Sequence, residues 1–372
     1  MKKTVIPALP PESEANQHSA RLQEVVARYP VRMTPQMAAR MAAGDPADPL
    51  VRQFLPRLEE LQTLPDETDD PISDAAYSPV AGIVHRYPDR VLVLPTWKCA
   101  VHCRFCFRRT RVGKPAPRLG AEEQDAALAY IRQHHAVREV ILTGGDPLML
   151  GLSPLRVWLE ALDAIPHVRV LRLHSRVPVV APERITPGLI RCLRKLETPV
   201  YLAVHANHPR EFTAPAGEAL RRLAQAGVGL LGQSVLLRGV NADADTLAAL
   251  MQAFLAHRIR PYYLHHLDPA PGTGHFRVSL AEGQALVQGL RGRLSGLAQP
   301  VYVLDIPGGH GKSPLDPGWV SAEGTQIRDW RGQLHPLPRG LAAAEPENPS
   351  LADSLAESGD SGGTRIEAED QR

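Results

Sequence analysis

The sequence predicts an α/β protein, a partial or open (β/α) barrel preceded by an N-terminal helical extension. From Arg90 onward, short runs of β-branched and aliphatic residues alternate with amphipathic segments at a pitch of about thirty residues, as strands and helices do in βα units. Each run is followed within a few residues by a polar or glycine-rich segment. Hydrophobic residues make up 44% of the 372 residues, which is enough for a large core. Together these observations favour a parallel sheet with crossover helices.

The barrel is expected over residues 81–325, with a strand wherever β-branched and aliphatic residues cluster. Seven such runs occur, at residues 91–94, 139–142, 168–171, 200–203, 229–231, 261–264 and 301–304. Amphipathic segments of helical character separate them, as crossover connections between parallel strands require.

Two regions of different composition flank the barrel. Residues 1–80 are expected to be helical, because apolar residues recur at helical spacing in Leu22-Val25-Val26 and again in Phe54-Leu58-Leu61, with prolines between. After Arg339 the chain is rich in Ala, Glu, Ser, Gly and Asp and poor in large apolar residues. Residues 345–372 are therefore predicted to be disordered.

Charge and apolar patterning argue against a nucleic-acid partner, a membrane span and a signal peptide. The chain has 42 Lys and Arg against 40 Asp and Glu, a net charge of +2, so no nucleic-acid partner is indicated. No apolar stretch approaches the length of a membrane span. Pro7, Pro10, Glu12 and Glu14 interrupt any run that could act as a signal peptide. We therefore expect a cytoplasmic protein without a membrane partner.

The most informative motif is a cysteine triplet, Cys99, Cys103 and Cys106, with gaps of three and two residues and with Phe105 just before its last member. Thiolates hold iron–sulfur clusters, and three of them leave one iron of a four-iron cluster without a protein ligand. An open iron can do chemistry. The triplet therefore predicts a reactive cluster rather than a structural one.

Other interpretations of the cysteines are weaker. A structural zinc site normally takes four ligands in two pairs, and no second pair is present, although His102 could supply one ligand. A disulfide framework does not fit four cysteines in a chain without a secretory signal. The fourth cysteine, Cys192, lies in an apolar-periodic stretch, which favours a core side chain over a ligand.

The polar segments that follow the predicted strands should converge. The carboxyl ends of parallel strands share one face of a barrel, and active sites are built there. A single polar loop would mean little, because most loops lie at the surface. Here seven follow one another, at residues 99–106, 143–146, 174–176, 205–208, 233–234, 265–268 and 305–312.

Two of these segments contain glycines whose placement indicates ligand binding. Gly144 and Gly145 directly follow a predicted strand, where the backbone can approach a ligand without obstruction by side chains. In residues 305–312, three glycines surround Lys312, so that its amine can be swung into a cavity. The spacing is not that of a Walker A loop.

Lys312 has a chemical role that suits such a position. A desolvated lysine can lose its proton and form a Schiff base with an aldehyde, of which pyridoxal phosphate is the obvious example. A second cationic cluster, Arg86, Tyr87 and Arg90, lies at the first strand and suits a phosphate dianion.

With these motifs assembled, the chain resembles the lysine 2,3-aminomutase family of radical S-adenosylmethionine enzymes over roughly residues 20 to 325. The matching stretches are residues 78–82, 85–90, the cysteine triplet with Arg108 and Arg109, 144–146, 175–176, 207–209, 233–241 and 305–312. The resemblance implies a barrel of the radical S-adenosylmethionine type. It also implies an isomerase that converts L-lysine to β-lysine by 5′-deoxyadenosyl radical and pyridoxal phosphate chemistry.

The same resemblance implies three cofactors and the residues that hold them. Cys99, Cys103 and Cys106 would bind a [4Fe–4S] cluster. S-adenosylmethionine would meet the loop of Gly144, Gly145 and Asp146, with His205 and Gln233 lining the pocket. Lys312 would carry pyridoxal 5′-phosphate, and its phosphate would be held by Arg86, Tyr87 and Arg90.

For the substrate, the resemblance implies that Arg108 binds the carboxylate and that Asp268 and Asp305 receive the distal ammonium of lysine. This assignment is physically reasonable, because burying an unpaired charge is prohibitive and a diamino acid needs a partner at each end. The alternative that both aspartates merely cap loops stays open, since aspartate is common in turns.

Two departures leave the physiological role open. The clostridial type of the family ends in a cysteine-rich zinc-binding tail, whereas no cysteine follows Cys192. Residues 100–109 and 261–265 instead resemble the short bacterial mutase that makes β-lysine for elongation factor P, although that relative lacks the Asp-Ile-Pro-Gly-Gly type of ending.

We expect a homo-oligomer, a small amino acid substrate and a reducing donor such as flavodoxin or ferredoxin. The alternatives are a mutase for another amino acid and an iron–sulfur electron-transfer or sensor protein in which Lys312 is incidental.

Overall fold

The fold is described from a computed structural model, which covers residues 14–42, 44–114, 118–316, 318–329 and 331–337. The tail predicted to be disordered, residues 345–372, lies outside these residues. The chain divides into two compact units, Met1–Pro317 and Gly318–Arg372.

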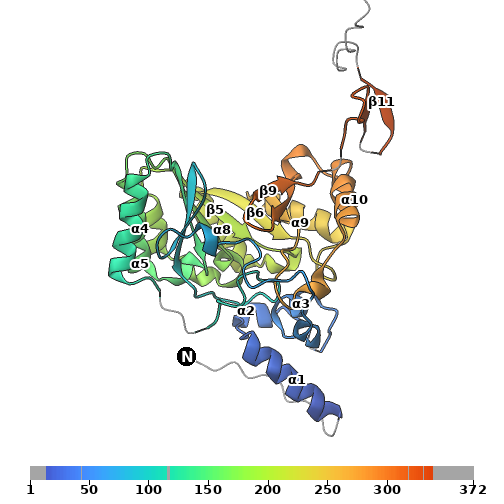
Figure 1. Ribbon diagram of the computed structural model, residues 1–372, viewed down its shortest axis with the longest axis horizontal. Coiled ribbons are helices and arrows are strands. Elements are labelled where there is room, and N and C mark those ends of the chain that lie inside the picture. The colour runs from blue at the N-terminus through green and yellow to red at the C-terminus, as the bar shows by residue number, and fades with distance from the viewer. Residues whose placement is uncertain (1–13, 43, 115–117, 317, 330, 338–372) are drawn as a thin grey trace, which may run out of the picture. The chain divides into compact units, whose positions relative to one another are not determined.

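The first unit is built on one curved sheet whose described strands follow each other in chain order (Figure 1). Strands β2 to β8 run parallel, and the edge strands β1 and β9 pair antiparallel with β2 and β8. Their bounds are β1 Ile83–Tyr87, β2 Arg90–Thr96, β3 Glu139–Gly144, β4 Val170–Ser175, β5 Val200–His205, β6 Gly229–Val235, β7 Arg260–His265, β8 Val301–Ile306 and β9 Gly311–Pro314. The predicted open parallel barrel is confirmed.

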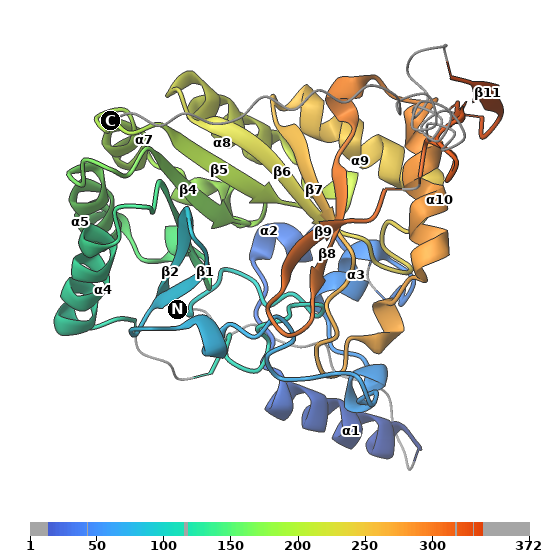
Figure 2. The ribbon, with the colours of Figure 1, turned by 45° about the horizontal axis from the view of Figure 1, so that its top comes forward.

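Helices connect the parallel strands and lie around the outside of the sheet (Figure 2). The α-helices are α4 Ala121–Gln133, α5 Leu152–Asp163, α6 Val177–Val180, α7 Pro187–Leu193, α8 Ala214–Gln225, α9 Ala244–Ala256 and α10 Leu280–Arg291. Short 3₁₀ turns lie at η3 Pro147–Met149, η4 Pro182–Arg184, η5 Pro209–Glu211, η6 Gly274–Phe276 and η7 Gly296–Ala298. Their apolar faces form one continuous core with the strands, and Cys192 of α7 is part of this core as predicted.

All seven predicted runs form parallel strands, although β4 begins at Val170 rather than at residue 168. The run pattern does not anticipate the edge strands β1 and β9, because polar and glycine residues interrupt their apolar sequence.

These two edges share no backbone pairing within the described sheet, but one side chain of β1 contacts β9 and another contacts β8. The backbone N–H of Lys312 on β9 donates to the Tyr87 hydroxyl on β1 at 2.8 Å. Arg86 of β1 lies 3.6 Å from Asp305 of β8.

The N-terminal part is helical, as expected, but only in short pieces. It contains α1 Glu14–Arg28, α2 Pro35–Ala38, α3 Pro49–Phe54, η1 Leu58–Leu61 and η2 Ala75–Tyr77. The apolar spacing of Phe54, Leu58 and Leu61 does not belong to one helix. Leu55, which precedes Pro56, is extended with ψ 146°, because proline disfavours a helical residue before it.

The second unit contains a described two-stranded antiparallel sheet, β10 Gln326–Arg328 and β11 Leu334–Pro336. The predicted barrel boundary at residue 325 lies within this unit.

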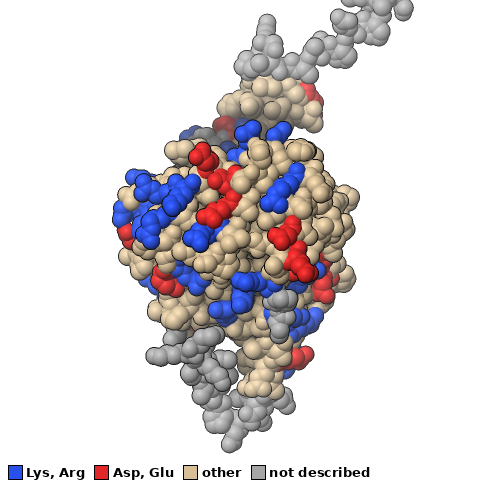
Figure 3. Space-filling model, turned by 90° about the vertical axis from the view of Figure 1, so that its left-hand side faces the viewer, with Lys and Arg blue, Asp and Glu red and all other residues tan. Residues whose placement is uncertain are grey.

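The charges visible in Figure 3 are mixed in sign, with Lys and Arg interspersed among Asp and Glu on the face shown. Among the described helices, none combines the length and apolar character needed to cross a membrane.

Candidate active site

A cavity of about 530 Å³ lies inside the barrel, lined from the strands and from the loops at their carboxyl ends. Every site residue predicted from the sequence lines it: Arg86, Tyr87, Arg90, Cys99, Cys103, Cys106, Arg108, Gly144, Gly145, Asp146, His205, Gln233, Asp268, Asp305 and Lys312. The thiols of the triplet and the amine of Lys312 therefore share one chamber.

The cysteine segment between β2 and α4 is an irregular loop held in place by the N-terminal part. The backbone N–H of His102 donates to the Arg32 carbonyl at 2.8 Å, and that of Arg104 to the Gln53 carbonyl at 2.9 Å. Arg104 also donates from Nε to the Glu60 carboxylate at 3.0 Å, and both side chains are fully buried.

Arg109, three residues after Cys106, adds a second contact to the same carboxylate. It pairs with Glu60 and stacks on Tyr29, with its guanidinium carbon 3.6 Å from the ring centroid. The helical extension thus supplies the carboxylate and the ring that position the loop carrying the thiols.

The three thiols fit an iron–sulfur cluster. Burial, together with the neighbouring Cys103, raises the pKa of Cys106 to about 11, and burial likewise raises the pKa of Cys99. No group of three or more His, Cys, Asp or Glu side chains in the described part of the chain converges as a single metal ion requires. A cluster offers a separate iron to each thiolate, so its cysteines need not meet at one point.

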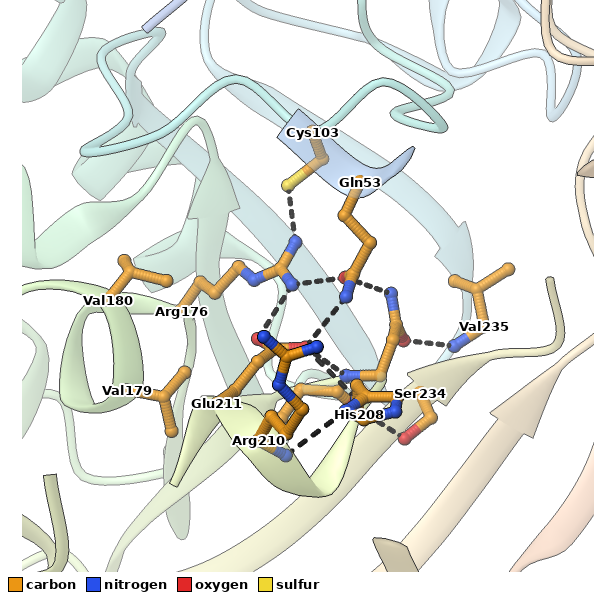
Figure 4. A network of polar contacts seen from close by, with 12 residues as sticks. Gln53, Cys103, Arg176, Val179, Val180, His208, Arg210, Glu211, Ser234 and Val235 are labelled. Carbon is orange, nitrogen blue, oxygen red and sulfur yellow. Dashed lines mark hydrogen bonds and ion pairs between the residues drawn. The ribbon is translucent and has the colours of Figure 1, made fainter. Parts of the chain in front are cut away.

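A polar network extends from the Cys103 sulfur through Arg176 to Gln53 and Glu211 (Figure 4). Arg176, which follows β4, donates from Nη1 to the Cys103 sulfur at 2.8 Å. Its Nη2 donates to Gln53 Oε1 at 2.5 Å and to Glu211 Oε2 at 2.7 Å. Gln53 in turn accepts from Asn207 at 3.2 Å. A buried cation is therefore fixed next to one of the predicted cluster ligands.

Gly144, the last residue of β3, and Gly145 are required by close backbone packing. A Cβ on Gly145 would lie 2.6 Å from backbone atoms of Trp97 and Lys98, at the start of the cysteine loop. The Gly145 N–H donates to the Thr96 carbonyl at 2.8 Å. Gly144 has φ +94°, a conformation that favours glycine. Both residues line the cavity, and Gly145 also packs the segment after β3 against the cysteine loop.

Asp146, the third member of that loop, has its described hydrogen bonds within the protein. Its carboxylate accepts from the Ser175 hydroxyl at 2.8 Å and from the Arg176 N–H at 2.9 Å. It therefore joins the loops after β3 and β4, although it also lines the cavity.

The amine end of the cavity lies at the β8–β9 hairpin. The prediction that Lys312 belongs to a pliant loop is wrong: Gly308 and Gly309 form the turn with positive φ, but Lys312 lies within β9, directly opposite Asp305. Its Nζ forms an ion pair with Asp305 Oδ2. A Cβ on Gly311 would lie 2.5 Å from the Tyr87 hydroxyl, so glycine is required where β9 approaches β1.

The second predicted acid, Asp268, follows β7. Burial raises its pKa to about 7, with the negative charge of Asp305 adding to the effect and with Lys312 and Arg108 opposing it. His265 lies at the end of β7, where burial and the charge of Lys312 together lower its pKa to about 3. This end of the cavity thus combines two carboxylates, one ammonium and a neutral imidazole.

Arg108 has a partner that the sequence did not reveal. Its Nε and Nη2 donate to Asp74 Oδ2 at 3.0 and 2.6 Å. Arg86 donates to the other oxygen of Asp74 at 3.4 Å. The acidic stretch before β1 gave no distinctive signal, because aspartate is common in turns.

Further residues at the cavity are not predicted from the sequence either, because no local sequence pattern marks them. Glu139 and Arg172 pair across β3 and β4 at 3.1 Å. Tyr262 and Tyr263 both line the cavity, although they are neighbours in a strand. An irregularity in the pairing of β6 with β7 allows this, because a bulge places successive side chains on one face.

Unpartnered polar atoms show that the cavity fits polar ligands. The Nε2 atoms of His174 and His205 are buried without a hydrogen-bond partner, and both side chains line the cavity. Burial lowers the pKa of both rings, and the charges of Arg172 and Arg176, respectively, lower it further. Neutral imidazoles that face a cavity can bind the polar groups of a cofactor.

Comparison with known proteins agrees with this arrangement. Residues 93–251, from β2 into α9, match the radical SAM superfamily. The L-lysine 2,3-aminomutase of Acetoanaerobium sticklandii is 39% identical over 321 residues, which is 86% of this chain and 76% of the relative. That of Clostridium subterminale is 42% identical over 291 residues, 78% of this chain and 70% of the relative.

A relative with a different substrate in its name is also similar. The glutamate 2,3-aminomutase of Clostridioides difficile is 35% identical over 316 residues, 84% of this chain and 74% of the relative. The extent and level of these similarities show that the chain belongs to the lysine 2,3-aminomutase family of radical S-adenosylmethionine proteins.

Proposed function

We propose that this protein is an isomerase that converts L-lysine to β-lysine. The observation that carries the proposal is the common cavity, in which three thiols, an amine, a guanidinium and two carboxylates face one another. Relatives named for lysine are 39% and 42% identical to this chain.

Family membership makes the protein an isomerase that uses a [4Fe–4S] cluster, S-adenosylmethionine and pyridoxal 5′-phosphate. When bound, these groups supply the radical and the conjugated ring on which it is delocalised, while the protein supplies placement. We assign the cluster to Cys99, Cys103 and Cys106.

The other two cofactors have their own sets of residues. We assign S-adenosylmethionine to the loop of Gly144, Gly145 and Asp146, with His205 and Gln233. Lys312 is assigned to the aldehyde of pyridoxal phosphate, and the phosphate to Arg86, Tyr87 and Arg90. The guanidinium carbon of Arg90 lies 3.7 Å from the centroid of the Tyr87 ring, and this contact holds Arg90 close to the end of β1.

The charges of the cavity favour a substrate with a carboxylate at one end and an ammonium at the other. We assign the carboxylate to Arg108 and the distal ammonium to Asp268 and Asp305. An amino acid with an acidic side chain, such as glutamate, would bring a third carboxylate to these two and is disfavoured, because an unpaired buried charge is costly.

Apolar side chains pack beside Cys103, which is itself partly buried. Phe105 is 4% exposed and packs against Phe276, Leu237 and Leu267.

The proposed chemistry also implies where the protein works and with what. One electron must reach the cluster, so we propose a reducing donor such as flavodoxin or ferredoxin and a cytoplasmic setting. All four cysteines are free thiols, which suits a reducing compartment. A homo-oligomer is proposed as the state in solution.

The test is anaerobic reconstitution of the full chain with iron, sulfide and pyridoxal phosphate. The protein is then incubated separately with lysine, arginine, ornithine and glutamate, together with dithionite and S-adenosylmethionine, and the products are separated by chromatography. We expect β-lysine from lysine. If lysine stays unchanged while another amino acid is converted, the substrate assignment is wrong. If cluster absorbance is present but no amino acid reacts, an electron-transfer or sensor role is favoured.

A further inference from the structure

The ammonium of Lys312 lies on one of the two carboxylates assigned to the substrate. Strands β8 and β9 pair with Asp305 directly opposite Lys312, so the two side chains project from the same face of the hairpin. Lys312 Nζ forms an ion pair with Asp305 Oδ2. The carboxyl is deeply buried, with 6% of its side chain exposed, whereas the lysine side chain is 30% exposed.

The rest of this carboxylate is poorly satisfied by the protein. Asp305 Oδ1 is buried without a hydrogen-bond partner. The Arg86 guanidinium lies 3.6 Å from this oxygen and also pairs with Asp74. Asp268 lies close enough for its charge to couple to that of Asp305. The subsite therefore holds two carboxylates, and the Lys312 ammonium is in contact with one of them, that of Asp305.

A lysine side chain of the protein and the side chain of free lysine end in the same group, a primary ammonium on a methylene chain. Asp305 can therefore make the same contacts with the Lys312 ammonium as with the distal ammonium of free lysine. Two ammonium ions at one deeply buried carboxylate would repel each other.

We propose, on the basis of the proposed function, that the Lys312 ammonium occupies the subsite of the substrate's distal ammonium in the free protein. A second cation then binds at Asp305 and Asp268 only after Lys312 has left Asp305 or has lost its charge. Lys312 is also the residue assigned to the cofactor's aldehyde. The event that engages its amine elsewhere therefore opens the subsite, which orders binding with the cofactor before the amino acid.

The experiment measures binding of 1,5-diaminopentane, which has the distal ammonium of lysine but no carboxylate, to the cluster-reconstituted full chain without pyridoxal phosphate. Isothermal titration calorimetry is carried out on the wild type and on Lys312→Met, Lys312→Gln and Lys312→Arg. We expect at least tenfold tighter binding to the Met and Gln variants, because both remove the competing charge. The Arg variant keeps the charge and should bind as weakly as the wild type.

A double variant identifies the carboxylate involved. Adding Asp305→Asn to Lys312→Met should abolish the gain in affinity. Circular dichroism checks that each variant is folded, and the Gln variant serves if the Met variant is not. Equal affinity of the wild type and the folded neutral variants would overturn the inference, as would a gain that persists without Asp305.

This measurement is independent of turnover, so the two proposals can fail separately. Failure of lysine conversion with the expected diamine result leaves Lys312 as the occupant of a cation subsite but removes lysine as the substrate. Lysine conversion with no difference in diamine affinity removes only the inference about Lys312.

Discussion

At the residue scale, two charged groups that we assign to ligand binding are paired within the protein. Arg108 is held by Asp74, and Lys312 by Asp305. Such pairing is expected where charges are enclosed, because an isolated buried charge costs several kcal/mol and a partner offsets most of it. The substrate must therefore replace or share these partners, and its affinity should report on them.

Replacement of Arg108 by Gln should weaken binding of lysine through its carboxylate alone. Loss of a charge-assisted hydrogen bond costs about 1.5–3 kcal/mol, which corresponds to about a tenfold to hundredfold rise in KM. Steady-state kinetics with lysine, and calorimetry with 1,5-diaminopentane, separate the two ends of the substrate. The control is Arg111→Gln, an exposed arginine of the same loop. A parallel loss of diamine binding would contradict the assignment.

The acidity of Asp268 predicts a pH dependence of substrate binding. Its pKa is raised to about 7 by burial and by Asp305, so the carboxyl is charged above this pH and neutral below it. Because the distal ammonium of lysine stays charged throughout this range, its attraction to the subsite should fall as the pH falls through 7. We expect kcat/KM for lysine to decrease by up to about tenfold per pH unit below 7.

The variant Asp268→Asn tests this origin. It should have low kcat/KM at all pH values and should lack the additional decline below pH 7. Lys312, Arg108, Asp305 and Asp74 also act on Asp268. A decline of unchanged steepness in the Asn variant would show that another group is responsible.

At the scale of elements, the loop after β3 and the cysteine loop after β2 form one packed unit. Hydrogen bonds join Gly145 to Thr96 and Asp146 to Lys98, each 2.8 Å long. The parallel pairing of β2 with β3 brings these loops together at the same end of the sheet. The cysteine loop therefore depends on a neighbouring loop that contains no cysteine.

Replacement of Gly145 by Ala should disturb the cluster loop, because the added methyl group would lie 2.6 Å from the backbone of Trp97 and Lys98. We expect lower iron content after reconstitution and a lower melting temperature. Gly289→Ala in α10 is the matched control, since a Cβ there meets nothing within 4 Å. In a helix this change should stabilise the protein by about 0.5–1 kcal/mol. Full iron loading of the Gly145 variant would contradict the packing argument.

At the scale of the whole first unit, the N-terminal extension and the barrel are joined by buried charge. Glu60 of η1 binds both Arg104 and Arg109, and Gln53 of α3 binds Arg176. The extension is thus part of the support of the active-site loop.

Replacement of Glu60 by Gln should therefore destabilise the protein strongly. Removing one member of a buried ion pair costs about 3–5 kcal/mol, because the remaining charges lose their partner. Urea unfolding of the purified full chain measures this cost. The neighbouring Glu59 is 43% exposed and pairs with Arg57 at the surface, so Glu59→Gln should cost at most about 1 kcal/mol. Equal stability of the two variants would show that the buried network contributes little.

Much of the fold was predictable because its signals are local. Each parallel strand is a short apolar run, and each helix has its own periodicity, so the order β2 to β8 follows from the chain alone. The edge strand β9 is not predictable in this way, since Gly308, Gly309 and Gly311 are as consistent with a pliant segment as with a hairpin. Pairing with β8 decides between them, and no local pattern encodes that pairing.

For the site, the chemical groups of the cavity can be read from the chain: three thiols at cluster spacing, a lysine among glycines, and polar residues after every strand. Their convergence follows from parallel topology, because the carboxyl ends of such strands share one face. The pairing of the charges cannot be read in this way, as with Asp74 and Arg108, or Glu60 and Arg104, which are 34 and 44 residues apart in the chain. An ion pair depends on distance in space and on burial, and both arise only when remote segments pack together.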